Sequence, residues 1–199
     1  INLTGGTSIN LQEGYGLEAS DTINLTTDNM QITSGTIKAN TLAASEALTL
    51  TGGTINAANI SAGTNLIHNG AIITADNDVT ISAGNNINLQ SGRLTANGAA
   101  FVVTNGTAGA NSIVESTSGY SLSAGSLSLS ANQGNVTLNG ANNVLQGVTL
   151  ANVGGNVEIV NGNDTNKKAL TIATAEGTTV GGTINVTNNG EGITVAGIN

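Results

Sequence analysis

The sequence predicts an all-β fold, a right-handed parallel β-helix (solenoid) with three short strands in each coil. Two observations predict it: a motif of apolar, small polar and apolar residues recurs between Gly, Asn or Asp residues, and apolar residues recur about 18 to 23 positions apart. No window has the apolar spacing of 3 and 4 residues that is typical of a helix. We therefore expect one repeat domain over residues 1–199 with roughly ten coils, right-handed because parallel crossovers generally are.

The strand motif can be followed along the chain in order. Each copy places alternate side chains on one face of a strand, which suits a strand with one buried side. The copies are Ile9–Leu11, Ile23–Leu25, Leu48–Leu50, Val79–Ile81, Ile87–Leu89, Leu127–Leu129, Val136–Leu138, Val157–Ile159, Ile184–Val186 and Ile193–Val195.

Three apolar columns define the repeat, and they predict three strands in each coil. Inward Ile, Leu and Val should stack as ladders, while Asn and Thr stack as hydrogen-bonding ladders at corners and faces. Tight turns between strands need positive φ, which favours Gly and Asn. The columns are Ile9, Met30, Leu48, Leu66, Ile87; then Ile37, Ile55, Ile73, Leu94; then Ile23, Leu42, Ile60, Val79, Phe101; the pattern resumes as Leu127, Val148, Leu170, Ile193.

The composition excludes several kinds of site. Asn, Thr and Gly make up 86 of the 199 residues, Cys and Pro are absent, and the net charge is -8. A chain without Cys and with one His offers no disulfide and no thiolate or His-cluster metal site. Four basic residues give no basic surface for nucleic acid, and no apolar run approaches the ~20 residues of a membrane-spanning helix. We expect a monomer without cofactors, and the start at Ile1 predicts a fragment of a longer protein.

Two intervals depart from the columns, near 103–118 and near 161–168. Loops that leave a rigid repeat scaffold commonly carry binding residues. We therefore predict binding contacts from Asn111, Glu115, Asp164, Lys167 and Lys168. Asn105 and Asn163 lie in Asn-x-Ser/Thr triplets within these intervals and are candidate glycan acceptors.

Candidate enzyme chemistry rests on few residues. A polysaccharide lyase or hydrolase would need Asp76 and Asp78, with Glu46 and Arg93 from neighbouring coils. Asp is common in turns for its local hydrogen bonds, so we expect solvated turn charges and no enzyme. The oxygens of 76–78 and 163–164 do not have the spacing of an EF-hand, and no metal site is predicted. His68 is expected to be an exposed turn residue.

A further alternative function is that of an ice-binding solenoid, in which regular Thr arrays face water.

The segment NDVTISAGNNINLQSGRLTA, residues 77–96, resembles the repeats of filamentous haemagglutinin. That family comprises large exoproteins of Gram-negative bacteria, among them adhesins and contact-dependent inhibition toxins, secreted by the two-partner route. The resemblance implies passage through an outer-membrane transporter partner, an extracellular or cell-surface location, and a role in virulence. It implies attachment to a host-cell glycan, to matrix or to other bacteria. We therefore expect a rigid extracellular β-helical shaft or adhesive segment.

Overall fold

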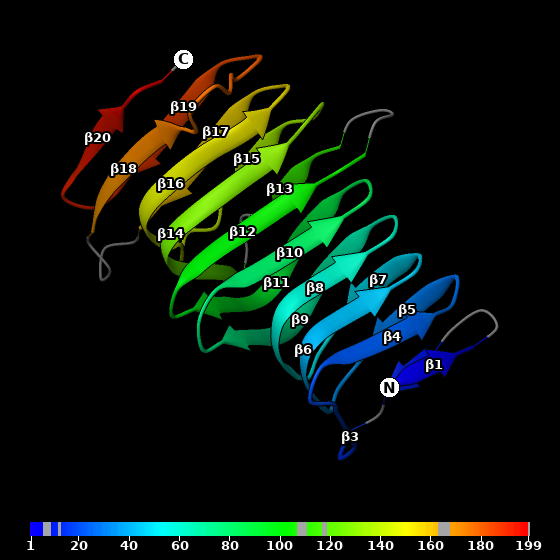
Figure 1. Ribbon diagram of the computed structural model, residues 1–199. Coiled ribbons are helices and arrows are strands. Elements are labelled where there is room, and N and C mark those ends of the chain that lie inside the picture. The colour runs from blue at the N-terminus through cyan, green and yellow to red at the C-terminus, as the bar shows by residue number, and fades with distance from the viewer. Residues whose placement is uncertain (6–8, 12, 107–110, 117–118, 163–167, 199) are drawn as a thin grey trace.

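The chain forms a stack of parallel strands wound around one axis (Figure 1). The structure is a computed structural model that describes residues 1–5, 9–11, 13–106, 111–116, 119–162 and 168–198. The described residues contain strands and turns but no helix. Within these ranges, no helix has the length and apolar character needed to cross a membrane. The predicted all-β parallel β-helix is confirmed, with about eight turns in place of ten.

The strands pair in three columns, here called the first, second and third face. The first face contains β1 (Asn2–Thr4), β4 (Thr22–Thr26), parts of β6 (Thr36–Ala44) and β8 (Thr54–Ala62), β10 (Val79–Ala83), β12 (Ala99–Thr104), parts of β14 (Tyr120–Ala131) and β16 (Val144–Val153), β18 (Ala169–Thr174) and β20 (Gly192–Ala196). The second contains β2 (Ile9–Leu11), β5 (Asn29–Ile32), β7 (Ala47–Leu50), parts of β9 (Leu66–Ala75) and β11 (Ile87–Ala96), β13 (Ile113–Glu115), β15 (Val136–Leu138), β17 (Val157–Asn161) and β19 (Ile184–Asn188). The third contains β3 (Gly16–Glu18) and the remaining parts of β6, β8, β9, β11, β14 and β16.

The register confirms two of the predicted columns and corrects the others. Residues in the Ile9 column and in the Ile37 column are direct neighbours in successive turns. In the Ile23 column, Ile60 is followed by Ile81 and Val102, not by Val79 and Phe101. Phe101 lies beside Thr80 and Ser128 on the outer surface. In the last column, Val148 pairs with Ile172 and not with Leu170, while Leu170 does pair with Ile193.

The turns of the second half are longer, which explains the smaller number of coils. Asn86 and Ser112 lie at equivalent positions of adjacent turns and are 26 residues apart, and Asn156 and Thr183 are 27 apart. The extra residues lie between strands, while the strands themselves keep their register. Corner insertions therefore lengthen a turn without interrupting the faces.

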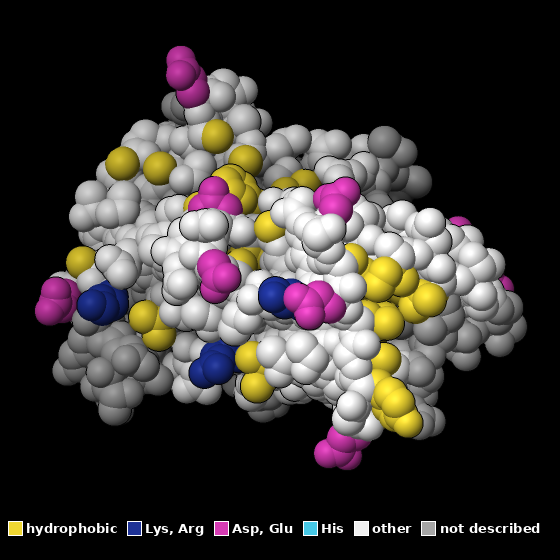
Figure 2. Space-filling model, turned by 60° about the horizontal axis from the view of Figure 1, so that its bottom comes forward, with side chains coloured by type: hydrophobic (Ala, Val, Ile, Leu, Met, Phe, Trp, Pro, Cys, Tyr) yellow, Lys and Arg dark blue, Asp and Glu magenta, His cyan; other side chains and the backbone are white. Residues whose placement is uncertain are grey.

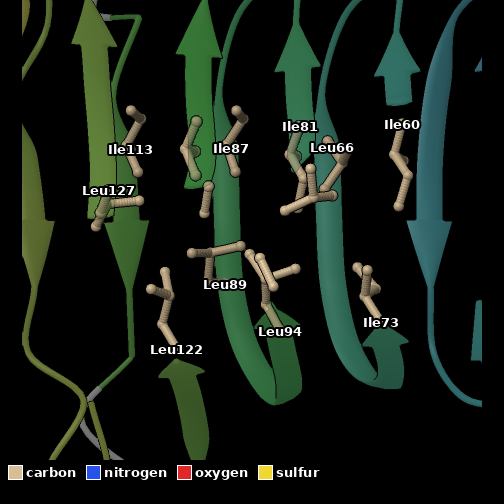
Figure 3. Packing of buried hydrophobic residues seen from close by; sticks show 14 of the residues in the cluster. Ile60, Leu66, Ile73, Ile81, Ile87, Leu89, Leu94, Ile113, Leu122 and Leu127 are labelled. Atoms are coloured by element: carbon tan, nitrogen blue, oxygen red, sulfur yellow. The ribbon is translucent and has the colours of Figure 1, made fainter. Parts of the chain in front are cut away.

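A continuous hydrophobic core fills the stack from Ile23 to Ile172. Figure 3 shows part of it, with labelled residues between Ile60 and Leu127. Strand residues alternate between buried and outward positions because the side-chain period of a strand is two. Leu66, Ile87 and Ile113 lie one above another on the second face, and Ile73, Leu94 and Leu122 do so on the third. The predicted inward ladders of Ile, Leu and Val are thus present.

The corner between the second and third faces is built on a column of glycines. Gly14, Gly35, Gly53, Gly70, Gly92 and Gly119 all have positive φ. Among the described residues, every positive φ belongs to a glycine, so the expectation that Asn also fills such turns was wrong. A Cβ on Gly53 would lie 2.6 Å from the carbonyl oxygen of Gly35, so stacking as well as φ selects glycine here.

Asparagines stack at the corner between the first and second faces. Asn86 Nδ2 donates to Asn65 Oδ1 over 3.3 Å, and Asn86 Oδ1 accepts from the backbone N–H of Ser112 at 3.0 Å. Further along, Asn135 Oδ1 accepts from the Asn156 N–H, and Asn156 Oδ1 accepts from the Thr183 N–H. These bonds satisfy backbone N–H groups just before the strands of the second face begin, and they confirm the predicted asparagine ladder.

Candidate functional site

The predicted contact residues near 103–118 lie mostly inside the stack. β12 ends at Thr104 and β13 returns at Ile113 to the second face, so both are part of the repeat. Asn111 is buried, and its carbonyl oxygen accepts a hydrogen bond from Thr104 Oγ1 at 3.0 Å. Glu115, only 2 % exposed, faces the core from β13. The expectation that Asn111 and Glu115 offer surface contacts was therefore wrong: the register of β13 turns Glu115 inward, and the Asn111 side chain is buried at the preceding corner, where its Nδ2 donates to the Gly106 carbonyl oxygen.

Asn105 is the candidate acceptor of this interval that the structure describes. It is exposed, and its backbone N–H donates to the Ala83 carbonyl oxygen at 3.0 Å. Its side chain is thus placed at a fixed point of the corner after β12. Residues 107–110 and 117–118 lie outside the described residues.

The second predicted interval is described only at its two ends. Asn161 and Gly162 are buried, whereas Lys168 is exposed and its carbonyl oxygen accepts from Asn188 Nδ2 at 2.9 Å. Asn163, Asp164 and Lys167 lie outside the described residues. Lys168 is therefore the predicted contact residue that the structure places on the surface.

The carboxylates considered for catalysis are spread over different corners. Asp76 and Asp78 connect β9 to β10, while Glu46 connects β6 to β7 at the next corner around the axis. Asp78 Oδ1 accepts the Ala99 backbone N–H at 2.7 Å, which is the local hydrogen bonding expected of a turn Asp. Among the described residues, no group of three or more His, Cys, Asp or Glu side chains is placed to hold a metal ion.

His68 is buried, which corrects the expectation of an exposed turn residue. It occupies an inward position of β9, in line with Leu50 before it and Leu89 after it. Its Nε2 lies 2.7 Å from the Ala71 carbonyl oxygen, which can only accept, so Nε2 carries the proton. Nδ1 then accepts from the Tyr120 hydroxyl at 2.8 Å. Burial lowers the pKa of His68 to about 4, so the ring is neutral at pH 7.

Glu115 replaces an aliphatic residue in the same ladder, two turns further along. It pairs with Leu89 on one side and Leu138 on the other. Its Oε2 accepts from the Gly140 N–H at 2.8 Å and from Asn143 Nδ2 at 2.6 Å. Its Oε1 is buried and has no hydrogen-bond partner among the described residues. Burial raises the pKa of Glu115, against the opposite effect of the two N–H donors.

Two buried asparagines lie near Glu115 and Tyr120, and their side-chain amides form hydrogen bonds with the backbone of β14 and β16. Asn143 Oδ1 accepts the Leu122 N–H at 3.0 Å. Asn161 accepts the Leu145 N–H at 2.8 Å and donates to the Leu145 carbonyl oxygen at 2.9 Å. Their amides extend the hydrogen bonding of the third face where it ends at β16. We call His68, Glu115, Tyr120, Asn143 and Asn161 the buried polar cluster.

The buried polar cluster is enclosed, so its chemistry is structural. All five side chains are at most 2 % exposed. The donors and acceptors that they share join turns whose residues are far apart in sequence. A signal for His68 and Glu115 exists in the sequence. Two positions after the column residues Leu48 and Ile87 stands a leucine, whereas His68 stands two positions after Leu66. Glu115 likewise stands two positions after Ile113, where the neighbouring motifs Ile87–Leu89 and Val136–Leu138 end in leucine.

The outer surface carries few charges, and these are scattered. The strand segments of the first face contain no Asp, Glu, Lys or Arg within the described ranges. On the third face, Lys38 Nζ forms an ion pair with Glu18 Oε1 at 2.9 Å, and both side chains are largely exposed. In the view of Figure 2, basic side chains are separate from one another and form no continuous positive area. Among the described residues, this face therefore offers no cluster of basic side chains that would bind several phosphate groups.

The three kinds of comparison with known proteins identify no relative. No family model, no characterised protein and no solved structure matches this chain significantly. Its function is therefore argued from its own geometry.

Proposed function

We propose that this chain is a rigid β-helical shaft segment of an extracellular exoprotein displayed by a Gram-negative bacterium. One observation carries the proposal: the first face continues from β1 to β20, the second from β2 to β19 and the third from β3 to β16, around a core that is aliphatic except for the buried polar cluster. Eight turns with a rise of roughly 4.8 Å each make a rod about 40 Å long. Such a segment holds the parts of a surface protein at a fixed separation.

Stiffness follows from how the turns are joined. Every strand between the two ends is hydrogen-bonded to the turn before and to the turn after. Bending the rod requires either stretching the ladder of one face or opening the core on that side. Both cost free energy in every turn involved, since repeat proteins are stabilised by contacts between neighbouring repeats.

A direct test of stiffness uses pairs of spin labels, because the chain has no Cys of its own. Thr22→Cys with Thr149→Cys places labels in one outward row of the first face, several turns apart. Thr80→Cys with Thr149→Cys is the matched shorter pair. A rigid shaft gives one narrow distance distribution for each pair. A distribution that broadens with the number of turns between the labels contradicts the shaft.

Adhesion is the second part of the proposal, with a host-cell glycan, matrix or a bacterial surface as ligand and an outer-membrane transporter as the partner during secretion. The contacts proposed are those of the 161–168 interval, of which Lys168 is a described and exposed residue. Purified protein on beads is allowed to bind epithelial cells. Lys168→Glu should lower bead binding, while Arg93→Glu, an equal charge change at an exposed position of the third face, should leave it unchanged. Equal binding by both variants removes the 161–168 interval from the proposal and leaves the shaft.

Asn105 is proposed as a glycan acceptor because its side chain is exposed at the corner after β12. The intact mass of protein from its native host tests this, with Asn105→Gln as the comparison. A glycan at Asn105 adds mass to the original protein that the Asn105→Gln variant lacks. If both proteins have the masses calculated from their sequences, the proposal is contradicted.

A further inference from the structure

β12 differs from its neighbours on the first face because it is apolar on both sides. Its inward residues Ala100 and Val102 belong to the core, and its outward residues are Ala99, Phe101 and Val103. A strand with apolar residues at successive positions is typical of sheets that are covered on both faces. The outer side of β12 therefore has the composition of a covered surface, although Phe101 is 36 % exposed.

The turns on either side of β12 carry small polar side chains at the matching outward positions. β12 lies between β10 and β14 (Figure 1). The matching outward residues are Thr80 and Ser82 in β10 and Ser126, Ser128 and Ser130 in β14. The result is an apolar stripe, one strand wide, across a face of hydroxyl groups. The side chains beside the stripe are too short to hold a second surface away from it.

The first face is also the uncharged side of an acidic molecule. The chain has 12 Asp and Glu against 4 Lys and Arg, which gives a net charge of -8. Strands of the other faces carry charges, with Glu158 on the second and Lys38 and Arg93 on the third. The strand segments of the first face carry none within the described ranges. Two copies can therefore meet through their first faces without burying a charge from these strands, which would be costly.

We propose that two copies of this chain associate side by side through their first faces, with β12 of one copy packed on β12 of the other about a two-fold axis. Phe101 and Val103 of each copy then cover those of the other. The short side chains around them allow the two sheets to approach to ~10 Å, the ordinary spacing of packed sheets. A two-fold contact of this kind closes on itself and stops at the dimer. The inference goes beyond the shaft function and differs from the expectation of a monomer.

The size of the first face is that of a weak dimer interface. From β4 to β16, segments of about five residues stack at roughly 4.8 Å per turn, so one copy offers about 500 Å². Two copies then bury about 1,000 Å² in total, which is near the lower end for specific interfaces. We therefore expect monomer and dimer to exchange within the range of concentrations that sedimentation can cover.

Sedimentation velocity tests the proposal on the whole chain, made in a host that does not glycosylate it. The sedimentation coefficient of the original protein should rise with concentration from that of a monomer to that of a dimer and no further. Phe101→Ser should stay monomeric over the same range. Thr80→Asp leaves Phe101 in place but puts a charge into the contact, so this variant should also stay monomeric.

The control variants make matched changes on the other two faces. Ile72→Ser on the third face and Val114→Ser on the second remove apolar side chains that are 38 % and 40 % exposed, close to the exposure of Phe101. Thr49→Asp adds the same charge as Thr80→Asp at an outward position of the second face. All three controls should dimerise like the original protein. Circular dichroism checks that each variant is folded, and Phe101→Thr replaces the Phe101→Ser variant if that one is not.

Several results would overturn the proposal. These are a monomer at every concentration, growth beyond the dimer, a dimer that survives either Phe101→Ser or Thr80→Asp, and loss of the dimer in any of the three controls. The label distances that test the shaft are measured with an excess of unlabelled protein, which removes distances between copies. Failure of the dimer is therefore distinguishable from failure of the shaft.

Discussion

The Tyr120 hydroxyl donates a hydrogen bond to His68 Nδ1 at 2.8 Å, although the two residues are 52 positions apart in the sequence. Their rings also meet edge to face, with centroids 5.1 Å apart. His68 belongs to the second face and Tyr120 to the third, two turns later. The bond therefore joins two faces as well as separate turns, inside a core that is mostly aliphatic.

Tyr120→Phe should destabilise the fold by about 1–3 kcal/mol, because it leaves the buried Nδ1 of His68 without a donor. The measurement is the free energy of unfolding in urea at pH 7. Tyr15→Phe is the control, since Tyr15 is 67 % exposed and its hydroxyl is solvated. If the two variants have equal free energies of unfolding, the buried hydrogen bond makes no net contribution to stability.

Acid should destabilise the protein through His68. The folded-state pKa of about 4 lies below the ordinary value of 6.5, so the neutral ring is favoured in the fold. The stability that this provides is present above pH 6.5 and is lost as the pH falls toward 4, with a limit of about 3 kcal/mol. His68→Gln should flatten the stability profile in that window. A profile with the same slope in both proteins contradicts the assignment.

Rising pH should destabilise the protein through Glu115. Burial raises the pKa of Glu115 above 4.5, so folding favours the protonated acid. The corresponding stability is present below pH 4.5 and is lost as the pH rises through the folded-state pKa. Glu115→Gln, which cannot ionise, should be more stable than the original protein at pH 8 and close to it at pH 4. Glu158→Gln, at an exposed position of the same face, is the control; a gain at pH 8 in that variant as well would mean that general charge reduction is responsible.

Gly53→Ala should destabilise the shaft more than Gly177→Ala. Both glycines have positive φ, 78° and 73°, for which a non-glycine residue costs roughly 1–2 kcal/mol. Only at Gly53 would the added Cβ meet the preceding turn, at 2.6 Å from the Gly35 carbonyl oxygen, whereas at Gly177 nothing lies within 4 Å. The difference in the free energy of unfolding therefore measures the contact between turns. No difference would mean that φ alone selects glycine at this corner.

Leu66→Ala should cost about 2–5 kcal/mol, since it opens a cavity in the second-face ladder between Leu48 and Ile87. Ile72→Ala, on an outward and 38 % exposed position of the same strand, should cost much less. Thermal unfolding followed by circular dichroism compares the two. Similar losses would contradict a core made of the inward rows.

The sequence was sufficient for the architecture because the aliphatic columns repeat at nearly constant spacing where the turns are short. It failed at Val79 and Phe101, where alternation within one strand offers two apolar candidates and only pairing with Ile60 decides between them. It also failed for His68 and Glu115, because composition alone treats a charged or polar residue next to a turn as exposed. Their burial depends on partners such as Tyr120 and Asn143 from other turns, and a single sequence does not reveal such pairings.

The 26-residue step from Asn86 to Ser112 has a consequence for how such a shaft can change over time. Additional residues enter at a corner, and the strands on either side still meet their neighbours in register. Sequence can therefore be gained, lost or diversified at the corners while the rod keeps its diameter and its axis. A scaffold of this kind separates the strands, which must stay constant to pair with their neighbours, from the corners, which can vary.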